Sequence, residues 1–227
     1  MSKEEITLIE TDEGHFYRTP CGILPSVTTI LQLIPKPALE IWKQREPAWR
    51  QISEQALKVG SLVHEAIDAY LKGDNLRLGE VLSTRCDEIE KPFSAFLRWK
   101  ENSGFKPLSN ELGIWSKRGY AGTADMIGHI NSKLYLVDLK TAKRIYPDYL
   151  LQVSAYRHAY EERTGERIEG LGILRLDKAE GFYEWKGYSE VDYESGLKAF
   201  LHLCEVWHSG QEVSNPRIEG IEKVCEE

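Results

Sequence analysis

Residues 120–140 read YAGTADMIGHINSKLYLVDLK, and this stretch decides the fold. Its first hydrophobic run contains Asp125, and its second, after a polar break at residues 131–133, contains Asp138 and Lys140. Two such runs joined by a polar turn predict a hairpin of antiparallel strands, which brings Asp125 beside Asp138. Because side chains alternate along a strand, Asp138 and Lys140 share one face while their apolar neighbours point into a core.

The two aspartates predict a metal site. Ionised carboxylates are seldom placed within apolar strands unless something compensates their charge. Two carboxylates this close favour a hard cation between them, so we expect Mg²⁺ or Mn²⁺ at Asp125 and Asp138. Such an ion polarises a phosphate oxygen and activates water, and Lys140 would orient that water or stabilise charge on phosphorus. The alternative is a cross-strand salt bridge between aspartate and lysine.

Residues 60–73 read GSLVHEAIDAYLKG and predict an amphipathic helix bounded by glycines. His64 lies at the edge of its apolar stripe, with Asp68 one turn later. The Asp68 carboxylate would hold one ring nitrogen of His64 and leave the other for a metal. The alternative is a boundary histidine whose hydrogen bonding Asp68 satisfies.

Two further segments supply candidate site residues. Residues 149–162, YLLQVSAYRHAYEE, predict a helix in which Gln152 and Tyr156 share a face. An amide and a phenol there would bind phosphate or the attacking water. Glu111 opens a predicted strand and offers another metal or water ligand. The alternatives are ordinary helix surface and a strand-end glutamate on the surface.

Taken in order, these residues resemble the PD-(D/E)XK nuclease superfamily, specifically its RecB-like exonuclease branch, which includes phage exonucleases and the mitochondrial genome maintenance exonuclease. The resemblance spans about residues 20–160. The matching elements, in chain order, are LPSVTTIL at residues 24–31, His64, Glu111, GTAD ending at Asp125, VDLK with Asp138 and Lys140, and Gln152-x-x-x-Tyr156.

The resemblance implies an α/β fold with a restriction-endonuclease-like central mixed β-sheet, flanked by helices and preceded by a helical lobe. It implies a metal-dependent DNA exonuclease that prefers single strands or free ends and acts in replication, repair or recombination. The metal would be held by Asp125, Asp138, the main-chain carbonyl of Leu139 and the ring of His64. The catalytic lysine would be Lys140, and the trailing motif Gln152 and Tyr156.

Cysteine placement separates the chain from one group in the same branch. The CRISPR-associated spacer-acquisition nucleases hold an iron-sulfur cluster with one early cysteine and three clustered near the C-terminus. The four cysteines here are scattered at Cys21, Cys86, Cys204 and Cys225. We therefore expect no iron-sulfur cluster.

Length and composition predict one soluble domain. The chain has 227 residues, of which 41% are hydrophobic. The expected nuclease domain spans residues 1–210, with a helical lobe at about 26–102 and the catalytic sheet and helices at about 111–210, followed by an acidic tail at 211–227. No apolar run is long enough to span a membrane, and the acidic N-terminus differs from signal and transit peptides. We expect a cytoplasmic protein with no membrane partner, and the sequence leaves its oligomeric state open.

The hydrophobic pattern predicts the order of elements. A terminal hairpin precedes the helical lobe, and the sheet follows. Helices are expected near residues 26–34, 37–57, 60–72, 86–102, 148–163 and 191–208, and strands near 111–117, 120–130, 133–139, 170–177 and 181–188. The long helical segment between His64 and Glu111 is expected to form an arch over the site, by analogy with the branch.

The net charge of −7 is unusual for a DNA-binding protein, because phosphate contacts need lysine and arginine. The charge lies at the ends: residues 1–13 sum to −4 and residues 211–227 to −3, so the remainder is neutral. Basic residues interleaved with tryptophans suit single-stranded DNA, the expected partner. The candidate contacts are Lys36, Trp42, Lys43, Arg45, Trp49, Lys143 and Arg144. The alternative is the solvated face of an amphipathic helix.

Other functions remain open at this point. One alternative is a structure-specific or nicking endonuclease of the same fold. A second is a nucleic-acid-binding module without catalysis, and intact His64, Asp125, Asp138 and Lys140 argue against it. A third is a hydrolase of small phosphoesters, which the aromatic residues near basic residues disfavour.

Overall fold

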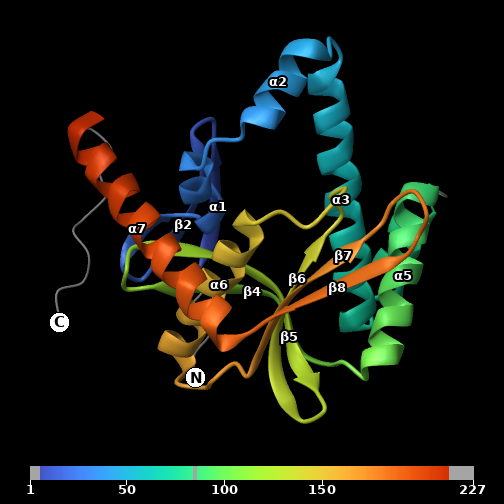
Figure 1. The fold of residues 1–227 in the computed structure, drawn as a ribbon. Coiled ribbons are helices and arrows are strands. Elements are labelled where there is room, and N and C mark those ends of the chain that lie inside the picture. The colour runs from blue at the N-terminus through green and yellow to red at the C-terminus, as the bar shows by residue number, and fades with distance from the viewer. Residues whose placement is uncertain (1–5, 84–85, 215–227) are drawn as a thin grey trace.

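The computed structural model describes residues 6–83 and 86–214. At its centre is a five-stranded sheet with the order β4-β5-β6-β7-β8 (Figure 1). The β6 and β7 strands are parallel, and the other neighbouring pairs are antiparallel. The predicted mixed α/β fold is confirmed. The strands are β4 (Lys106–Ser116), β5 (Tyr120–Ile130), β6 (Lys133–Lys140), β7 (Gly170–Leu176) and β8 (Tyr183–Tyr188).

The β5-β6 hairpin forms as predicted. The paired residues run from Ile130, opposite Lys133, to Met126, opposite Val137. Asn131 and Ser132 lie between these strands and both have positive φ, at 50° and 65°. A two-residue connection with this backbone matches the right-handed twist of the strands it joins. The turn therefore fixes the register of the two strands. In this register Asp125 and Asp138 lie one residue beyond the last paired residues.

Helices cover both faces of the sheet. The first face packs against α1 (Val27–Ile30), α6 (Asp148–Thr164) and α7 (Glu190–Ser214). The second packs against α3 (Trp49–Lys72), α4 (Asn75–Leu82) and α5 (Asp87–Ser103). The two remaining helical elements are η1 (Leu31–Leu33) and α2 (Pro37–Arg45).

The side chains of β6 alternate between these two faces. Leu134 and Leu136 belong to the core under α6 and α7, whereas Val137 and Leu139 belong to the core under α3 and α5. Strand periodicity therefore places Asp138 on the α6 side of the sheet. This is the alternation that the sequence predicts for the LYLVDLK run.

A small antiparallel sheet precedes the helices, with the order β1-β2-β3. Its strands are β1 (Thr7–Thr11), β2 (Gly14–Thr19) and β3 (Gly22–Pro25). The hairpin of β1 and β2 was predicted, and β3 was not. Thr29 fastens this sheet to α1, because its hydroxyl accepts from the His15 N–H and donates to the His15 carbonyl, both at 2.9 Å.

Several predicted helix boundaries are wrong. The predicted helix at 37–57 breaks after Arg45, because Pro47 disfavours a helical conformation at Glu46, whose φ and ψ are −106° and 101°. The predicted start at Gly60 is instead the middle of α3. Gly60 lies where a Cβ would come within 3.1 Å of the Thr141 hydroxyl, so the glycine permits close approach of the helix to the loop after β6.

Further differences lie at α4 and at the C-terminus. The α4 helix was not predicted, although Asp74 caps it by accepting from the Arg77 N–H. The last helix continues to Ser214, so the first residues of the predicted acidic tail are helical. The rest of that tail, residues 215–227, lies outside the described residues. Within the described part of the chain, each helix is too short or too polar to cross a membrane.

Candidate metal centre

The pairing of β5 with β6 ends one residue before Asp125 and Asp138. Beyond the last pair, Met126 and Val137, the Leu139 N–H donates to Asp125 Oδ2 at 2.6 Å instead of to a backbone carbonyl. In a strand, the N–H and C=O of one residue point to the same side, so the Leu139 carbonyl also faces Asp125. The Asp125 carboxylate thus takes the place of a strand partner for Leu139, directly beyond the paired part of the hairpin.

Three elements bring His64, Glu111 and Asp125 together. His64 comes from α3, Glu111 from β4 and Asp125 from β5, and one ligand atom from each lies within 4.8 Å of the others. His64 Nδ1 is 3.6 Å from Asp125 Oδ1 and 4.0 Å from Glu111 Oε1. Glu111 has a φ of 48°, a backbone conformation that is uncommon for residues other than glycine. An imidazole and two carboxylates at this spacing form a mixed nitrogen and oxygen donor set.

Asp138 is the most unusual group of the site. Its side chain is 1% exposed, and within the described residues neither carboxylate oxygen has a hydrogen-bond donor. Lys140 Nζ lies 2.7 Å from Asp138 Oδ2, as an ion pair outside hydrogen-bonding angles. Burial raises the pKa of Asp138 to about 6, in spite of the opposing effect of Lys140. A buried carboxylate with so few partners calls for a further cation.

The neighbouring groups titrate against one another. Burial alone would raise the pKa of Asp125, but the charges of His64 and Lys140 and the Leu139 N–H bring it below its usual value. Burial would lower the pKa of His64, and the Asp125 carboxylate outweighs it, so that pKa is raised. Burial and the nearby Asp125 charge raise the pKa of Glu111 to about 7. Glu111 and Asp138 therefore hold their protons more tightly than free carboxylic acids, and a bound metal would compete with those protons.

The hydrogen-bond partner predicted for His64 is wrong. The Asp68 carboxylate pairs with Lys72 at 2.7 Å and accepts from the Asn110 amide, and His64 instead faces Asp125 and Glu111. Tertiary partners on the sheet thus replace the partner one turn away on the same helix.

Gln152 and Tyr156 are buried on the face of α6 that covers the sheet. Gln152 Nε2 donates to the Tyr156 hydroxyl at 3.1 Å. Burial and then the Asp138 charge hold the pKa of Tyr156 well above its usual value, so this phenol keeps its proton. Gly122 makes room for the ring, because a Cβ there would lie 2.5 Å from Tyr156 Cε1. The GTAD segment, residues 122–125, and the pair of Gln152 and Tyr156 are therefore packed against each other at Gly122.

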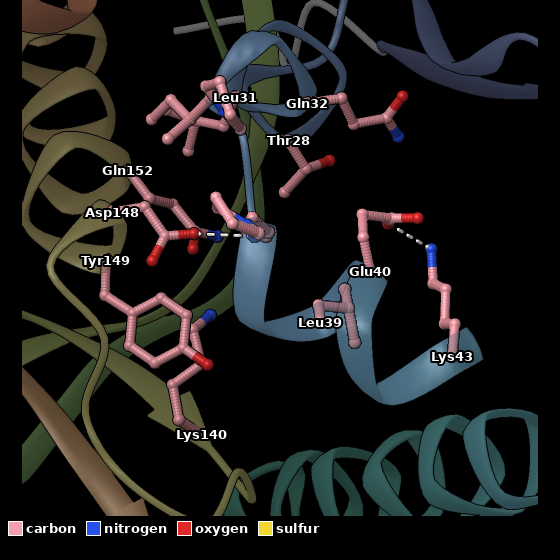
Figure 2. Close-up of a pocket in the computed structure, with 14 residues that line it drawn as sticks. Thr28, Leu31, Gln32, Leu39, Glu40, Lys43, Lys140, Asp148, Tyr149 and Gln152 are labelled. Carbon is pink, nitrogen blue, oxygen red and sulfur yellow. Dashed lines mark hydrogen bonds and ion pairs between the residues drawn. The ribbon is translucent and has the colours of Figure 1, made fainter. Parts of the chain in front are cut away.

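Two cavities flank the site. The larger, of about 820 Å³, lies between α2 and the start of α6 and is lined by Lys140, Tyr149 and Gln152 among others (Figure 2). The smaller, of about 540 Å³, is lined by His64 and Glu111 on the other side. Each cavity thus has candidate site residues in its lining, Lys140 and Gln152 in the larger and His64 and Glu111 in the smaller.

The predicted nucleic-acid contacts fall into three groups. Lys36 and Lys43 line the larger cavity. Trp42, Arg45 and Trp49 are not among its lining residues, and Lys43 and Arg50 each lie 5.3 Å from the centre of the Trp49 ring. Lys143 and Arg144 are exposed on the loop after β6.

The segment expected to arch over the site does not do so where it was predicted. Between His64 and Glu111, α5 packs Phe93, Phe96 and Trp99 into the core against the sheet. In Figure 1, α2 and the first turns of α3 instead lie beyond the end of β6, at the top of the view. The apolar face of α5 explains the difference, since it is buried.

Two tyrosines near the site were not predicted. The Tyr17 hydroxyl of β2 lies 3.0 Å from the Thr123 hydroxyl of β5, and burial, together with the Glu111 and Asp125 charges, raises its pKa. Tyr149 lies at the start of α6, with Lys140 Nζ 4.9 Å from its ring centre. No sequence signal marks the Tyr17 contact, because its partner is 106 residues away. The contact of Tyr149 with Lys140 could have been predicted, because only a short polar loop separates the two residues in the sequence.

No protein-family model matches the sequence, and no curated protein matches it significantly. Among solved structures, a candidate exonuclease from Eubacterium rectale aligns with a TM-score of 0.50 and 15% identity, over 71% of this chain and 70% of that one. An alkaline exonuclease from Laribacter hongkongensis aligns with a TM-score of 0.35 and 16% identity, over 58% of this chain and 72% of that one. The first likeness shows that this chain shares the fold of the Eubacterium protein.

Proposed function

We propose that this protein is a metal-dependent deoxyribonuclease that hydrolyses phosphodiester bonds from DNA ends, with a preference for single strands, in replication, repair or recombination. The observation that supports it most strongly is Asp138, a buried carboxylate with no hydrogen-bond donor among the described residues, next to Lys140 and near a histidine-carboxylate cluster. The fold shared with a candidate exonuclease is consistent with this proposal. So are the cavities on both sides, because a polymer must enter and leave.

The donor set fits Mg²⁺ or Mn²⁺. We infer that His64, Asp125, Asp138 and the Leu139 carbonyl hold the ion, with Glu111 as a further ligand or as a partner of its water. Carboxylates that repel one another in a buried site are stabilised by a divalent cation. When bound, the metal supplies Lewis acidity toward a phosphate oxygen and lowers the pKa of a water molecule.

Lys140 contributes positive charge rather than a base. Burial would lower its pKa, but Asp138 and Asp125 outweigh that effect and raise it, so the side chain is an ammonium at neutral pH. An ammonium fixed beside Asp138 donates to a water or to a phosphate oxygen, where charge grows in the transition state. Gln152 and Tyr156 add an amide and a protonated phenol from α6, which orient a phosphate oxygen by hydrogen bonding.

The test is cleavage of end-labelled single-stranded DNA, duplex DNA and a small aryl phosphate. We expect DNA to be cleaved with Mg²⁺, at least equally well with Mn²⁺, and not after chelation. Asp138→Asn and Lys140→Ala should each lower the rate by roughly 10²-fold or more, and Asp138→Asn should leave DNA binding in chelator largely intact. Lys133→Gln, at the opposite end of the same strand, is the matched control and should cleave normally.

Three results would each count against the proposal in a different way. Undiminished cleavage by Lys140→Ala would remove the catalytic assignment of that lysine. DNA binding by the wild-type protein without cleavage under any metal would favour a binding module. Preferred hydrolysis of the aryl phosphate would favour a hydrolase of small phosphoesters.

A further inference from the structure

Two aromatic rings with a cation at each end form a row between the end of β6 and the start of α6. Lys140 Nζ lies 4.9 Å from the centre of the Tyr149 ring, and Tyr149 meets Tyr146 edge to face at 5.7 Å. The Arg144 guanidinium lies 4.9 Å from the centre of the Tyr146 ring. The two rings are partly exposed and Arg144 is exposed. Lys140, Tyr149, Tyr146 and Arg144, here called the ladder, thus lead outward from the metal centre.

The ladder begins in the larger cavity, whose lining contains three lysines and two carboxylates, Lys36, Lys43, Lys140, Glu40 and Asp148. Figure 2 shows Lys140 and Tyr149 on one side and α2, with Leu39 and Lys43, on the other. Lys36 and Lys43 also line the cavity, and each is held by one carboxylate, Asp148 at 2.9 Å and Glu40 at 2.7 Å. Lys36 is exposed and Lys43 is partly exposed, so a phosphate can share or replace these partners.

The smaller cavity has the opposite character. Its described lining contains the carboxylates Glu65, Asp68 and Glu111 together with His64, and neither lysine nor arginine. A phosphate there meets like charge, whereas a phosphate in the larger cavity meets ammonium groups. A polyanion should therefore bind more favourably in the larger cavity than in the smaller one.

We propose that the ladder and the larger cavity form the subsite that binds the uncleaved body of a single DNA strand, with bases stacked on Tyr149 and Tyr146. This inference rests on the proposed nuclease function. Phosphates then contact Lys36 and Lys43, and the released end leaves through the smaller, acidic cavity. Stacking on rings beside cations is tolerant of base identity, which suits an enzyme without sequence preference.

The proposed subsite also changes which aromatic residues are expected to stack with DNA bases. Tyr149 lines the larger cavity, whereas Trp42 and Trp49 do not. Stacking energy should therefore come from the tyrosines of the ladder and only weakly from the tryptophans of α2 and α3.

Binding is measured with a fluorescein-labelled oligothymidylate in chelator, on the Asp138→Asn protein so that no cleavage occurs. We expect Tyr149→Leu and Tyr146→Leu each to weaken binding about 10-fold, and Tyr149→Phe and Tyr146→Phe to retain it. The matched control is Tyr70→Leu, which removes another partly exposed ring with a lysine 5.7 Å from its centre, on the other side of the sheet. Unchanged binding by both leucine variants would overturn the stacking role.

Salt dependence tests the cavity lysines, because removal of one lysine–phosphate interaction reduces the slope of log affinity against log salt by about 0.7 for single strands. Lys36→Gln and Lys43→Gln should each reduce the slope by that amount, and Lys133→Gln should not. An oligothymidylate with one 5-iodouracil should also cross-link to Tyr149 or Tyr146 under ultraviolet light. Cross-links confined to residues of the smaller cavity would reverse the assigned direction and overturn the proposal.

The outcomes separate this subsite from the nuclease function. Cleavage by the wild-type protein together with normal binding by the ladder and lysine variants would overturn the subsite alone. Absence of both cleavage and binding in the wild-type protein would overturn the nuclease function and this inference with it.

Discussion

Asp138 shows how a single residue can oppose folding and still be required. Its carboxylate is buried, near enough to Tyr156 to raise the pKa of that phenol, and Lys140 is its ion-pair partner. Removing a charge from water costs several kcal/mol in proteins, so a neutral side chain would fold more easily here. Sites that hold metals accept this cost, because the ion restores the balance when it binds. The same reasoning applies to Glu111. Its side chain is less buried than that of Asp138, so a substitution there tests the effect of the charge on stability with less disturbance of the packing.

We expect Glu111→Gln to raise the melting temperature of the metal-free protein at pH 8. The folded state holds the Glu111 proton more tightly than the unfolded chain, since its pKa is raised from 4.5 to about 7, chiefly by burial. Wild-type stability should therefore fall, relative to the variant, as the pH rises from about 4.5 to about 7, and the two should converge below pH 4.5. Thermal melts across this range measure the difference.

Two additions make the stability experiment decisive. Glu54→Gln, at an exposed position of α3, is the control and should follow the wild-type protein at every pH. With saturating Mn²⁺ at pH 8, wild type should gain more stability than Glu111→Gln, because binding to the folded state stabilises in proportion to affinity. A variant that is less stable than wild type in chelator at pH 8 would contradict the raised pKa.

At the scale of elements, the packing of α6 on β5 positions the trailing pair against the aspartates. The Tyr156 ring crosses β5 at Gly122, where no side chain stands between them. The ring lies on the same side of the sheet as Asp138, and Gln152 lies one turn earlier on α6. A strand residue without a Cβ is therefore a structural requirement of the site.

We expect Gly122→Ala to destabilise the protein by roughly 1–3 kcal/mol, because the new Cβ would lie 2.5 Å from Tyr156 Cε1 and force the ring or the helix to move. Cleavage should fall further than stability explains, since Tyr156 and Gln152 move together. Gly79→Ala in α4, where a Cβ meets no atom within 4 Å, should stabilise by roughly 0.5–1 kcal/mol. Urea unfolding curves give both values, and a neutral Gly122→Ala would show that α6 shifts freely.

The elements also show what the sequence can predict. The β5-β6 hairpin and the alternation of Asp138 with its apolar neighbours were predictable, because period-2 patterns and turn residues are local. The break at Pro47 was equally local and was obscured by the surrounding amphipathic pattern. The contact of Tyr17 with Thr123 could not be predicted, since nothing in either segment specifies a partner 106 residues away. His64 illustrates the same limit, because tertiary partners displaced the local Asp68.

At the scale of the whole molecule, α2 contributes no residue to the hydrophobic clusters of the described structure. None of its residues is buried, and Lys36, at its N-terminal end, is joined to Asp148 of α6 by an exposed ion pair. Together with the first half of α3, which descends to His64, it lies over the end of β6 (Figure 1). A helix this poorly buried is not there to stabilise a core, which favours a role in enclosing substrate.

If α2 and α3 enclose the strand over the metal centre, DNA must enter by an end. We expect a linear single strand to be degraded to short products and a covalently closed circle of the same sequence to survive in Mn²⁺. A linear strand with streptavidin bound to biotin at both ends should resist like the circle, whereas the same strand with biotin alone should be cleaved. Both comparisons keep the sequence and the phosphate charge constant, so only access differs. Equal cleavage of circle and linear strand would show an endonuclease, in which α2 moves aside or the strand binds without passing beneath it.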